Sequence, residues 1–499
     1  MKSFLSVLVG TVLFCASNSL LAQTDKPNIL FIISDDMGIE TVESYGIGLD
    51  PPKTATLGEL ASNGVSFTNM WAQPVCSPTR ATILTGRYGF RTGVGGPTGD
   101  NVARGEMPAP PAIVPANLGA LPVSSAAGGG AGNGGMGAGG GGGGGGGGQG
   151  VTSARWGISL EEFTLPQAFN EVPELGYDKA AIGKWHLADT RNGWEDHPNL
   201  AGFEYFKGLV RCCPEHYYGW VDLENGEFST RTGYAPSAKV DDAIDWLGNP
   251  SDREEPWFLW LAFNTPHSPI HIPPRELLQS DDPALDDPEA GNRPAFKAMI
   301  EAMDTEIGRL LDYIGPEELE NTYVIFIGDN GTGRGVIDEP FRGSSHKGTV
   351  WNGGIMVPFI ITGPGVAQGE TSHALVNSTD LYSTMMEMAG INFEETVPDN
   401  IAHDSVSLMP YLSNPDRESI RDWIYVDRFN TEEGVKAGEY AIRDQKYKYL
   451  NDEGTEYFFD LEVDPYEYNN LLDGELSNAE RSRFASLKAQ IEDLHNSEN

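Results

Sequence analysis

A cysteine at the start of a short predicted helix is the first group in the sequence with the chemistry of a nucleophile. In the stretch CSPTRATILTG, Ser77 is expected to cap this helix, Pro78 suits its first position and Gly86 suits its end. The backbone amides and the helix dipole would then face Cys76, with Arg80 one turn further on. This setting suits the hydrolysis of an anionic ester. Taken alone, Cys76 is more often a buried structural thiol.

Two pairs of side chains offer oxygen ligands to a metal ion. Asp35 and Asp36 follow one apolar run, and Asp329 and Asn330 follow another. Because no soft ligand lies beside either pair in the sequence, they favour a hard cation, Mg²⁺ or Ca²⁺. Each pair separately also fits a helix cap or a tight turn. Two such pairs in one chain strengthen the prediction of a metal site.

Four further residues offer cations and proton donors: Lys184, His186, His267 and Lys347. Together they could surround a divalent anion and protonate a leaving alkoxide or phenoxide. Any one of them alone is more often a surface group or a satisfied core group.

Most of these residues follow four apolar runs of the kind that forms buried strands. The runs are Asn28–Ser34, Ala180–Gly183, Trp257–Pro266 and Tyr323–Gly328. Helical stretches between apolar runs are typical of βαβ units, so the sequence predicts an α/β fold with a mainly parallel central sheet flanked by helices. Ligands bind beyond the carboxyl ends of strands in such sheets. We therefore expect four distant segments to deliver their polar ends to one place.

The remaining elements divide the chain. Apolar residues near a 3.6-residue period predict a helix over about 294–313 that packs on the sheet. Aromatic runs between about 416 and 470 predict a smaller antiparallel sheet, closed by a helix near 479–494. We expect a signal peptide at 1–22, a catalytic domain at 23–415 and a C-terminal subdomain at 416–499.

The first residues predict export. Lys2 precedes an apolar run from Phe4 to Phe14, and small residues end near Ala22, as in a signal peptide. A lipoprotein acylated at Cys15 is the weaker interpretation, because the residues before it are not small. No later run reaches the roughly 20 apolar residues of a membrane span. The mature protein is therefore expected to be periplasmic or secreted.

Composition argues against some partners. The chain has 33 basic and 72 acidic residues, a formal charge of −39, and 39% hydrophobic residues over 499 positions. Nucleic acid as the main partner is excluded by the lack of a basic footprint. Between 128 and 150, 18 of 23 residues are glycine. This stretch predicts a flexible surface insertion over about 104–153.

Three cysteines remain once the predicted signal peptide is removed. Cys212 and Cys213 are adjacent, so they form either a vicinal disulfide or buried thiols, and Cys76 has no obvious partner. We assign the adjacent pair to structure, because nothing near it in the sequence completes a metal site or lowers a thiol pKa.

The stretch Cys76–Arg80 resembles the Cys-x-Pro-x-Arg signature of the type I, formylglycine-dependent sulfatases of the alkaline phosphatase superfamily. Apart from the signal peptide and about 100–153, the resemblance covers nearly the whole chain. Other segments similar to family motifs occur in the usual order: Pro27–Asp36, Ile182–His186, Thr265–His267 with Pro269, Phe326–Gly331, His346–Gly354 with Val357–Pro358, Phe459–Glu467 and Asn469–Leu471.

This resemblance implies a mechanism at named residues. Cys76 would be oxidised to formylglycine by a maturation enzyme, and one hydroxyl of the hydrated aldehyde would attack sulfur while deprotonation of the other expels sulfate. Arg80 would hold the hydrate, and His186 would assist sulfate release. One Ca²⁺ would be bound by Asp35, Asp36, Asp329, Asn330 and the modified Cys76. Lys184, His267 and Lys347 would grip the sulfate group of a small molecule or glycan.

The sequence departs from the family pattern at three positions. Thr79 replaces the more usual Ser of the signature, which keeps the hydroxyl. Asn352 and Met356 stand where Glu and Arg are usual, which puts local salt bridges in doubt.

A phosphonate monoester or phosphodiester hydrolase with the same site is the alternative enzyme. A non-catalytic, calcium-binding exported protein with unmodified Cys76 is the alternative outside the enzyme class.

Overall fold

The structure is a computed structural model that describes residues 26–99, 156–249, 253–287, 289–341, 343–431 and 433–497. The predicted signal peptide and the predicted Gly-rich insertion lie outside these ranges. Within them, no helix has both the length and the apolar character needed to cross a lipid bilayer.

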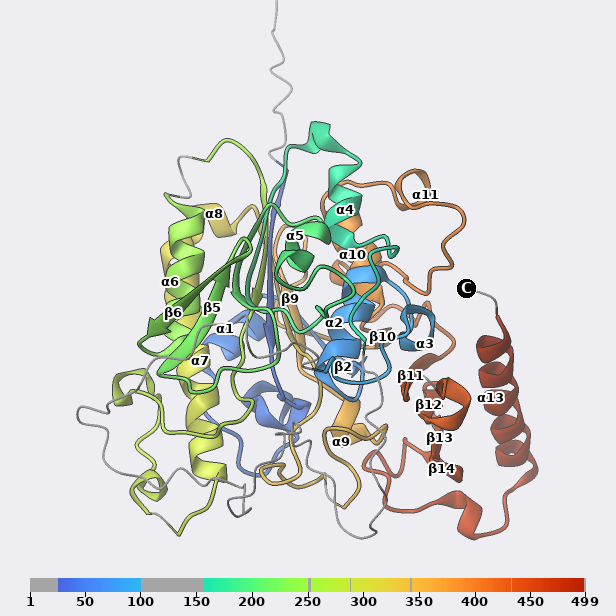
Figure 1. Ribbon diagram of the computed structural model, residues 1–499. Coiled ribbons are helices and arrows are strands. Elements are labelled where there is room, and N and C mark those ends of the chain that lie inside the picture. The colour runs from blue at the N-terminus through green and yellow to red at the C-terminus, as the bar shows by residue number, and fades with distance from the viewer. Residues whose placement is uncertain are drawn as a thin grey trace, which may run out of the picture.

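A ten-stranded sheet forms the centre of the larger unit (Figure 1). Strands β8, β1, β7, β3 and β4 run parallel to one another, and β10 runs parallel to β2. Strand β9 is antiparallel to both β2 and β8, β5 is antiparallel to β4, and β5 and β6 form an antiparallel hairpin. In order across the sheet, the strands are β10 (Glu370–Asn377), β2 (Val65–Trp71), β9 (Phe359–Thr362), β8 (Thr322–Gly328), β1 (Asn28–Ser34), β7 (Trp257–Ala262), β3 (Asp178–Lys184), β4 (Tyr205–Leu209), β5 (Gly219–Glu224) and β6 (Glu227–Thr232).

The four predicted strands are the adjacent strands β8, β1, β7 and β3. They pair in parallel, as in the register of Ile29 with Tyr323 on one side and with Phe258 on the other. Their carboxyl ends therefore share one edge of the sheet. The predicted α/β fold with a mainly parallel sheet is confirmed.

Helices cover both faces of this sheet (Figure 1). In β1, Phe31 points into the core shared with α2, α4 and α10, while the next residue, Ile32, points into the core shared with α1, α6 and α7. Because successive strand residues face opposite sides, a strand buried on both faces is apolar throughout. The sandwich of helices around the sheet is thus encoded in the unbroken apolar run of β1.

The helices of the described ranges vary widely in length. The longest, α7, confirms the helix predicted over 294–313 and buries Ile300 and Met303 against the sheet. The α-helices are α1 (Ala55–Ser62), α2 (Cys76–Thr85), α3 (Gly89–Thr92), α4 (Leu165–Asn170), α5 (His197–Leu200), α6 (Ala235–Leu247), α7 (Arg293–Ile314), α8 (Pro316–Leu319), α9 (Asn352–Ile355), α10 (Asp380–Met388), α11 (Phe393–Thr396), α12 (Met409–Leu412) and α13 (Asn478–Asn496). Short 3₁₀ turns occur at Ile39–Thr41, Glu43–Tyr45, Pro173–Leu175, Trp194–Asp196, Arg275–Leu277, Pro283–Asp286, Val435–Ala437 and Leu471–Asp473.

A smaller antiparallel sheet lies beside the large one and is closed by α13 (Figure 1). One of its faces packs with Trp71 of β2, and the other packs with Ile491 of α13. Its four strands are β11 (Ile424–Arg428), β12 (Glu439–Arg443), β13 (Tyr447–Asp452) and β14 (Thr455–Asp460). The predicted C-terminal sheet and helix are therefore present.

Candidate active site

The carboxyl ends of the four central strands bring the predicted polar residues together. Asp35 follows β1, and its amide donates to the carbonyl of Thr265 beyond β7 at 3.0 Å. Asp329 follows β8, and its amide donates to the carbonyl of Ser34 at 2.9 Å. Lys184 is the last residue of β3. These backbone hydrogen bonds continue the sheet past the strand ends and hold the site residues on a rigid edge.

Cys76 is the first residue of α2, so the helix begins two residues before Pro78, the first position that the sequence predicted. The prediction that Ser77 caps this helix is wrong, because extended Val75 holds the capping position without a side-chain cap. Ser77 instead donates to the carbonyl of His186 at 2.8 Å and accepts from the amide of Thr98 at 2.9 Å. The predicted end at Gly86 is confirmed, where the backbone adopts a left-handed φ of 68°.

Each acid of the site is paired with one predicted cation. Lys184 Nζ lies 2.6 Å from Asp35 Oδ2, with neither side chain exposed. Lys347 Nζ lies 2.5 Å from Asp36 Oδ1. A buried charge is tolerated when it is paired and hydrogen-bonded, so these contacts explain how the acids persist inside the protein.

The third acid, Asp329, is held by the motif helix. Arg80 donates to Asp329 Oδ2 from Nε at 3.1 Å and from Nη2 at 2.9 Å, and its Nη1 donates to the carbonyl of Lys184 at 2.7 Å. Thr79 donates to the carbonyl of Asp329 at 2.5 Å and accepts from the amide of Gln73 at 2.9 Å. Thr79 stands where the family usually has Ser, and its hydroxyl makes both of these hydrogen bonds. Arg80 joins α2 to the ends of β3 and β8.

The electrostatic environment shifts the pKa values of Asp36 and Asp329 in opposite directions. Burial would raise the pKa of Asp36, but Lys347, His267 and Lys184 outweigh it and hold that pKa below its usual range. Burial, together with the charge of Asp35, raises the pKa of Asp329 to about 6. The surrounding cations thus favour the carboxylate form of Asp36, whereas burial disfavours the charged form of Asp329 in spite of its pairing with Arg80.

Cys76 completes a group of candidate metal ligands. One ligand atom each from Asp35, Asp36, Cys76 and His267 lies within 4.8 Å of the others. Lys347 Nζ lies 3.9 Å from Cys76 Sγ. Burial and the charge of Asp35 raise the pKa of the Cys76 thiol to about 12. As a plain thiol, Cys76 would therefore be a weak nucleophile at neutral pH.

Two buried oxygens at the site are suited to bind a cation. Asp35 Oδ1 and Asn330 Oδ1 have no hydrogen-bond partner among the described residues. The other amide atom, Asn330 Nδ2, donates to Asp36 Oδ1 at 2.9 Å, which leaves the amide oxygen free to bind a metal. An unpaired buried oxygen is costly, and a hard cation would satisfy both. The donor set therefore fits Ca²⁺ or Mg²⁺.

The two predicted histidines differ in their surroundings. His267 Nδ1 lies 2.8 Å from the Ser268 carbonyl, and its Nε2 lies 3.8 Å from Asp36 Oδ2. Burial and Lys347 lower the pKa of His267 to about 4. His186 Nε2 lies 3.2 Å from the Thr98 carbonyl, and its buried Nδ1 has no partner among the described residues. His186 is thus tied to the motif helix through Ser77, whereas His267 faces the acids directly.

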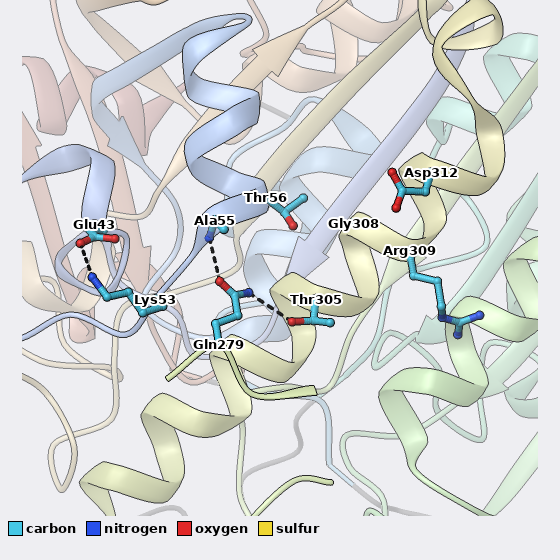
Figure 2. Close-up of a pocket in the computed structure, with 9 residues that line it drawn as sticks. All are labelled: Glu43, Lys53, Ala55, Thr56, Gln279, Thr305, Gly308, Arg309 and Asp312. Carbon is cyan, nitrogen blue, oxygen red and sulfur yellow. Dashed lines mark hydrogen bonds and ion pairs between the residues drawn. The ribbon is translucent and has the colours of Figure 1, made fainter. Parts of the chain in front are cut away.

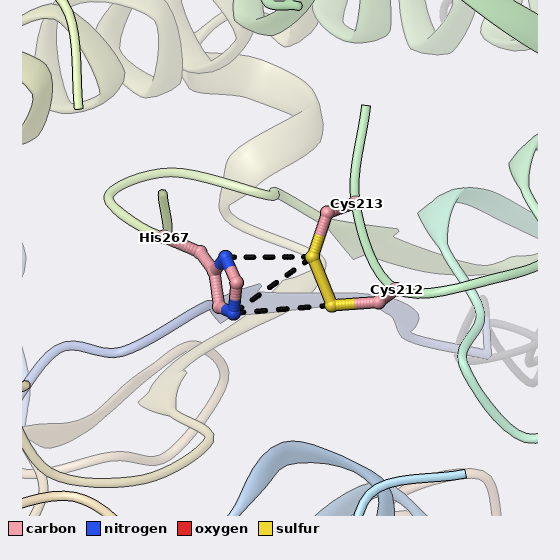
Figure 3. A group of neighbouring side chains, drawn as sticks. All are labelled: Cys212, Cys213 and His267. Atoms are coloured by element: carbon pink, nitrogen blue, oxygen red, sulfur yellow. Dashed lines mark hydrogen bonds between the residues drawn. A yellow bond between two sulfur atoms is a disulfide. The ribbon is translucent and has the colours of Figure 1, made fainter. Parts of the chain in front are cut away.

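The adjacent cysteines lie beside the site, which the sequence did not indicate. Cys212 and Cys213 form a disulfide, and both sulfur atoms contact the ring of His267 (Figure 3). Of the two alternatives that the sequence left open, a vicinal disulfide or two buried thiols, the structure has the disulfide, whose sulfurs are bonded to each other and are not thiolate ligands for a metal. The contact joins loops more than 50 residues apart in sequence.

A departure from the family pattern is compensated locally. Asn352 donates from Nδ2 to the Pro465 carbonyl at 2.9 Å, and its amide donates to Glu467 Oε2 at 2.7 Å. Glu467 also forms a fully buried ion pair with Lys448. Lys448 Nζ donates to Asn352 Oδ1 at 3.0 Å. The carboxylate in this junction therefore comes from Glu467 of the C-terminal unit.

Sequence reasoning also missed residues that hold the site from behind. Gln73, just before the motif, links Thr79 to the amide of Asp427 in β11 through its side-chain oxygen. Tyr217 donates to the carbonyls of Asn264 and His267. The polar side chain at Gln73, next to the motif, was a weak signal, whereas nothing in the local sequence identifies Tyr217.

A separate hollow of about 660 Å³ lies between the start of α1 and α7 (Figure 2). Its Lys53 is paired with Glu43, and Gln279 bridges the Ala55 amide and Thr305. The predicted site residues do not line it. We therefore place the candidate chemistry at the strand ends.

Comparisons with known proteins show the family of the chain. The family model "Sulfatase" matches residues 27–122 and 144–391, and the model "N-sulphoglucosamine sulphohydrolase, C-terminal" matches residues 343–497. The ulvan-active sulfatase of Formosa agariphila is 28% identical over 467 residues, covering 90% of this chain and 77% of the relative.

Two solved structures have the same fold. The structure of Ps i-CgsB in complex with k-i-k-neocarrahexaose has a TM-score of 0.69 at 22% identity, covering 95% of this chain and 93% of that chain. The structure of BT4656 in complex with its substrate D-glucosamine-2-N,6-O-disulfate has a TM-score of 0.63 at 20% identity, covering 94% and 97% of the two chains.

Proposed function

This chain belongs to the sulfatase family and hydrolyses sulfate esters, and we propose that it does so through a formylglycine made from Cys76 with one bound Ca²⁺. The observation that carries the proposal is the position of Cys76. It begins α2 within 4.8 Å of ligand atoms of Asp35, Asp36 and His267, and 3.9 Å from the ammonium of Lys347. Converged carboxylates and a cation around this one side chain suit a modified nucleophile rather than a structural thiol.

The metal would be held by Asp35, Asp36, Asp329, Asn330 and the modified Cys76. When bound, Ca²⁺ would supply positive charge that polarises a sulfate oxygen. Asp35 and Asn330 each contribute an oxygen that has no other partner among the described residues. Positive charge at this point would also lower the pKa of Asp329, which burial holds near 6.

The modified side chain would supply the nucleophile, as the hydroxyl of a hydrated aldehyde. Lys347 bridges Asp36 and Cys76 and is placed to attract an anionic oxygen near both. Lys184, buried against Asp35, would supply a second cation to the sulfate group. Arg80 would hold the modified residue while it fixes Asp329. These groups would stabilise charge that develops during cleavage of the S–O bond.

The histidines would handle protons. With Nδ1–H of His267 bonded to the Ser268 carbonyl, Nε2 must gain a proton to donate to sulfate, and a nearby anion would raise its pKa toward that state. With Nε2–H of His186 bonded to the Thr98 carbonyl, Nδ1 is the ring atom left to accept a proton. His186 would therefore act as a base in sulfate release and His267 as a donor to bound sulfate.

A sulfated saccharide is the substrate class that we propose. The relative from Formosa agariphila is an ulvan-active sulfatase, and BT4656 was solved with a disulfated glucosamine as its substrate. We also propose that the protein is exported, on the strength of residues 1–22. N-terminal sequencing of the mature protein from its native host, with a start after Ala22, would support export.

The test is to express the chain with and without a formylglycine-generating enzyme. We expect mass spectrometry to find an aldehyde at residue 76 only with that enzyme, and activity on an aryl sulfate to appear only then. The protein carrying the thiol is the matched control. An intact thiol after co-expression would support the non-catalytic alternative, and a preference for an aryl phosphonate would support the phosphonate monoester or phosphodiester alternative.

A further inference from the structure

The Cys212–Cys213 disulfide lies directly against the ring of His267 (Figure 3). Cys213 Sγ lies 3.4 Å from Nδ1 and 3.8 Å from Nε2, and Cys212 Sγ lies 3.8 Å from Nε2. The ring is thus in contact with both sulfur atoms along one side. The ring also contacts the Ser268 carbonyl at 2.8 Å and the Ser268 hydroxyl at 3.4 Å through Nδ1, and its Nε2 lies 3.8 Å from Asp36 Oδ2.

The two loops that carry these groups are joined by hydrogen bonds. Asn264 donates from Nδ2 to the Cys212 carbonyl at 2.9 Å. The buried hydroxyl of Tyr217 lies 2.5 Å from the Asn264 carbonyl and 2.8 Å from the His267 carbonyl. The backbone of His267 is therefore fixed to the same loop whose disulfide contacts its ring. The two bonded sulfur atoms therefore hinder rotation of the imidazole away from Asp36 on the side where they contact the ring.

We propose that the Cys212–Cys213 disulfide is a positioning element that holds His267 Nε2 toward the sulfate site. The inference rests on the proposed function, in which Nε2 contacts bound sulfate. Disulfide sulfurs carry no hydrogen, so they support the ring without donating to its nitrogens. Two thiols at the same positions would each carry an S–H donor that competes for the imidazole nitrogens. Without the covalent bond, the two sulfur atoms would also be free to move independently.

This role predicts an effect on substrate binding that passes through His267. In the mature enzyme, replacing both cysteines (Cys212→Ser with Cys213→Ser) should raise KM for a sulfate ester about tenfold, with a smaller change in kcat, because a misplaced binding group weakens capture of the anion. In a His267→Ala background the same double change should alter KM less than about twofold, since residues that act as a unit are not additive. A merely structural disulfide would give equal factors in both backgrounds.

Two further measurements separate positioning from folding. Tyr217→Phe, which removes the hydroxyl anchored to the His267 carbonyl, should also raise KM, whereas its neighbour Tyr218→Phe, which loses a comparable bond to the Ile272 carbonyl, should not. Treatment of the unmutated enzyme with a phosphine reductant should raise KM reversibly, and the double serine variant should not respond. This variant controls for reaction of the reductant with the aldehyde.

The outcomes of these experiments separate the positioning role of the disulfide from the proposed sulfatase function. An inactive mature enzyme in every background would contradict the proposed function. An active enzyme whose cysteine and His267 effects multiply independently, or whose KM stays unchanged when the disulfide is lost, would overturn the positioning role and leave the sulfatase assignment intact.

Discussion

Arg80 donates two hydrogen bonds to a single oxygen of Asp329, and neither side chain is exposed to solvent. The pair joins the helix that carries Cys76 to the end of β8. The Arg80 guanidinium therefore has two roles: it orients a predicted metal ligand, and it fixes the helix of the predicted nucleophile.

Removing Arg80 should destabilise the fold as well as abolish activity. Arg80→Ala leaves Asp329 buried without its partner, and loss of one member of a buried pair typically costs about 3–5 kcal/mol. Chemical denaturation of the variant and the unmutated protein measures the difference. Arg275→Ala, which breaks an exposed pair with Asp286, is the control and should cost less than about 1 kcal/mol. Equal losses in the two variants would contradict the structural role of the buried pair.

The hydroxyl of Thr79 should matter more than its methyl group. Thr79→Val would remove the donor to the Asp329 carbonyl and the acceptor for the Gln73 amide, at a cost of about 1–3 kcal/mol for buried groups left unpaired. Thr79→Ser keeps the hydroxyl and should cost about 1 kcal/mol or less. Thermal unfolding of both variants tests the order, and a valine variant as stable as the serine variant would refute it.

Much of the site could be anticipated because of how parallel sheets are built. Unbroken apolar runs identify strands buried on both faces, and the residues that follow them must meet at one edge, which is where Asp35, Asp329 and Lys184 lie. The pairing of Lys184 with Asp35, and of Lys347 with Asp36, depends on side-chain reach and could not be obtained from the order of the segments.

Contacts between loops were beyond sequence reasoning. The sequence analysis misplaced the start of α2 because serine is a common N-cap residue. The Ser77 hydroxyl instead hydrogen-bonds to the backbone of Thr98 and His186, which are distant in sequence. The contact of Cys213 with His267 likewise joins two loops that are distant in sequence. No local periodicity or turn signal encodes such a contact.

Calcium should stabilise the protein through the acids at the strand ends. At a free concentration 100 times the Kd, a ligand that binds only the folded state adds about 2.7 kcal/mol. Chelation should therefore lower both activity and the unfolding temperature, and added Ca²⁺ should restore them. In Asp35→Asn the response should be greatly weakened, whereas in Asp286→Asn, a change at an exposed acid, it should persist. Stoichiometric Ca²⁺ binding retained with full affinity in Asp35→Asn would contradict its ligand role.

Asp427 should make stability depend on pH in a predictable direction. This acid of β11 is fully buried, and its Oδ2 accepts from the Phe90 amide at 3.0 Å. Burial raises its pKa from 3.8 to about 7. Between these values the unfolded chain releases the proton while the folded protein keeps it. The contribution of Asp427 to stability therefore falls as pH rises through that window, by up to about 1.4 kcal/mol per pH unit.

Asp427→Asn should remove this dependence, because the amide oxygen can still accept from Phe90 and carries no titratable proton. The difference in unfolding free energy between the variant and the unmutated protein should shift in favour of the variant from pH 4 to pH 7. Denaturant titrations at several pH values in that range measure it, with Asp286→Asn as the exposed control, for which the difference should stay nearly flat. A flat difference for Asp427→Asn as well would mean that the buried carboxyl is already ionised in the folded protein at low pH.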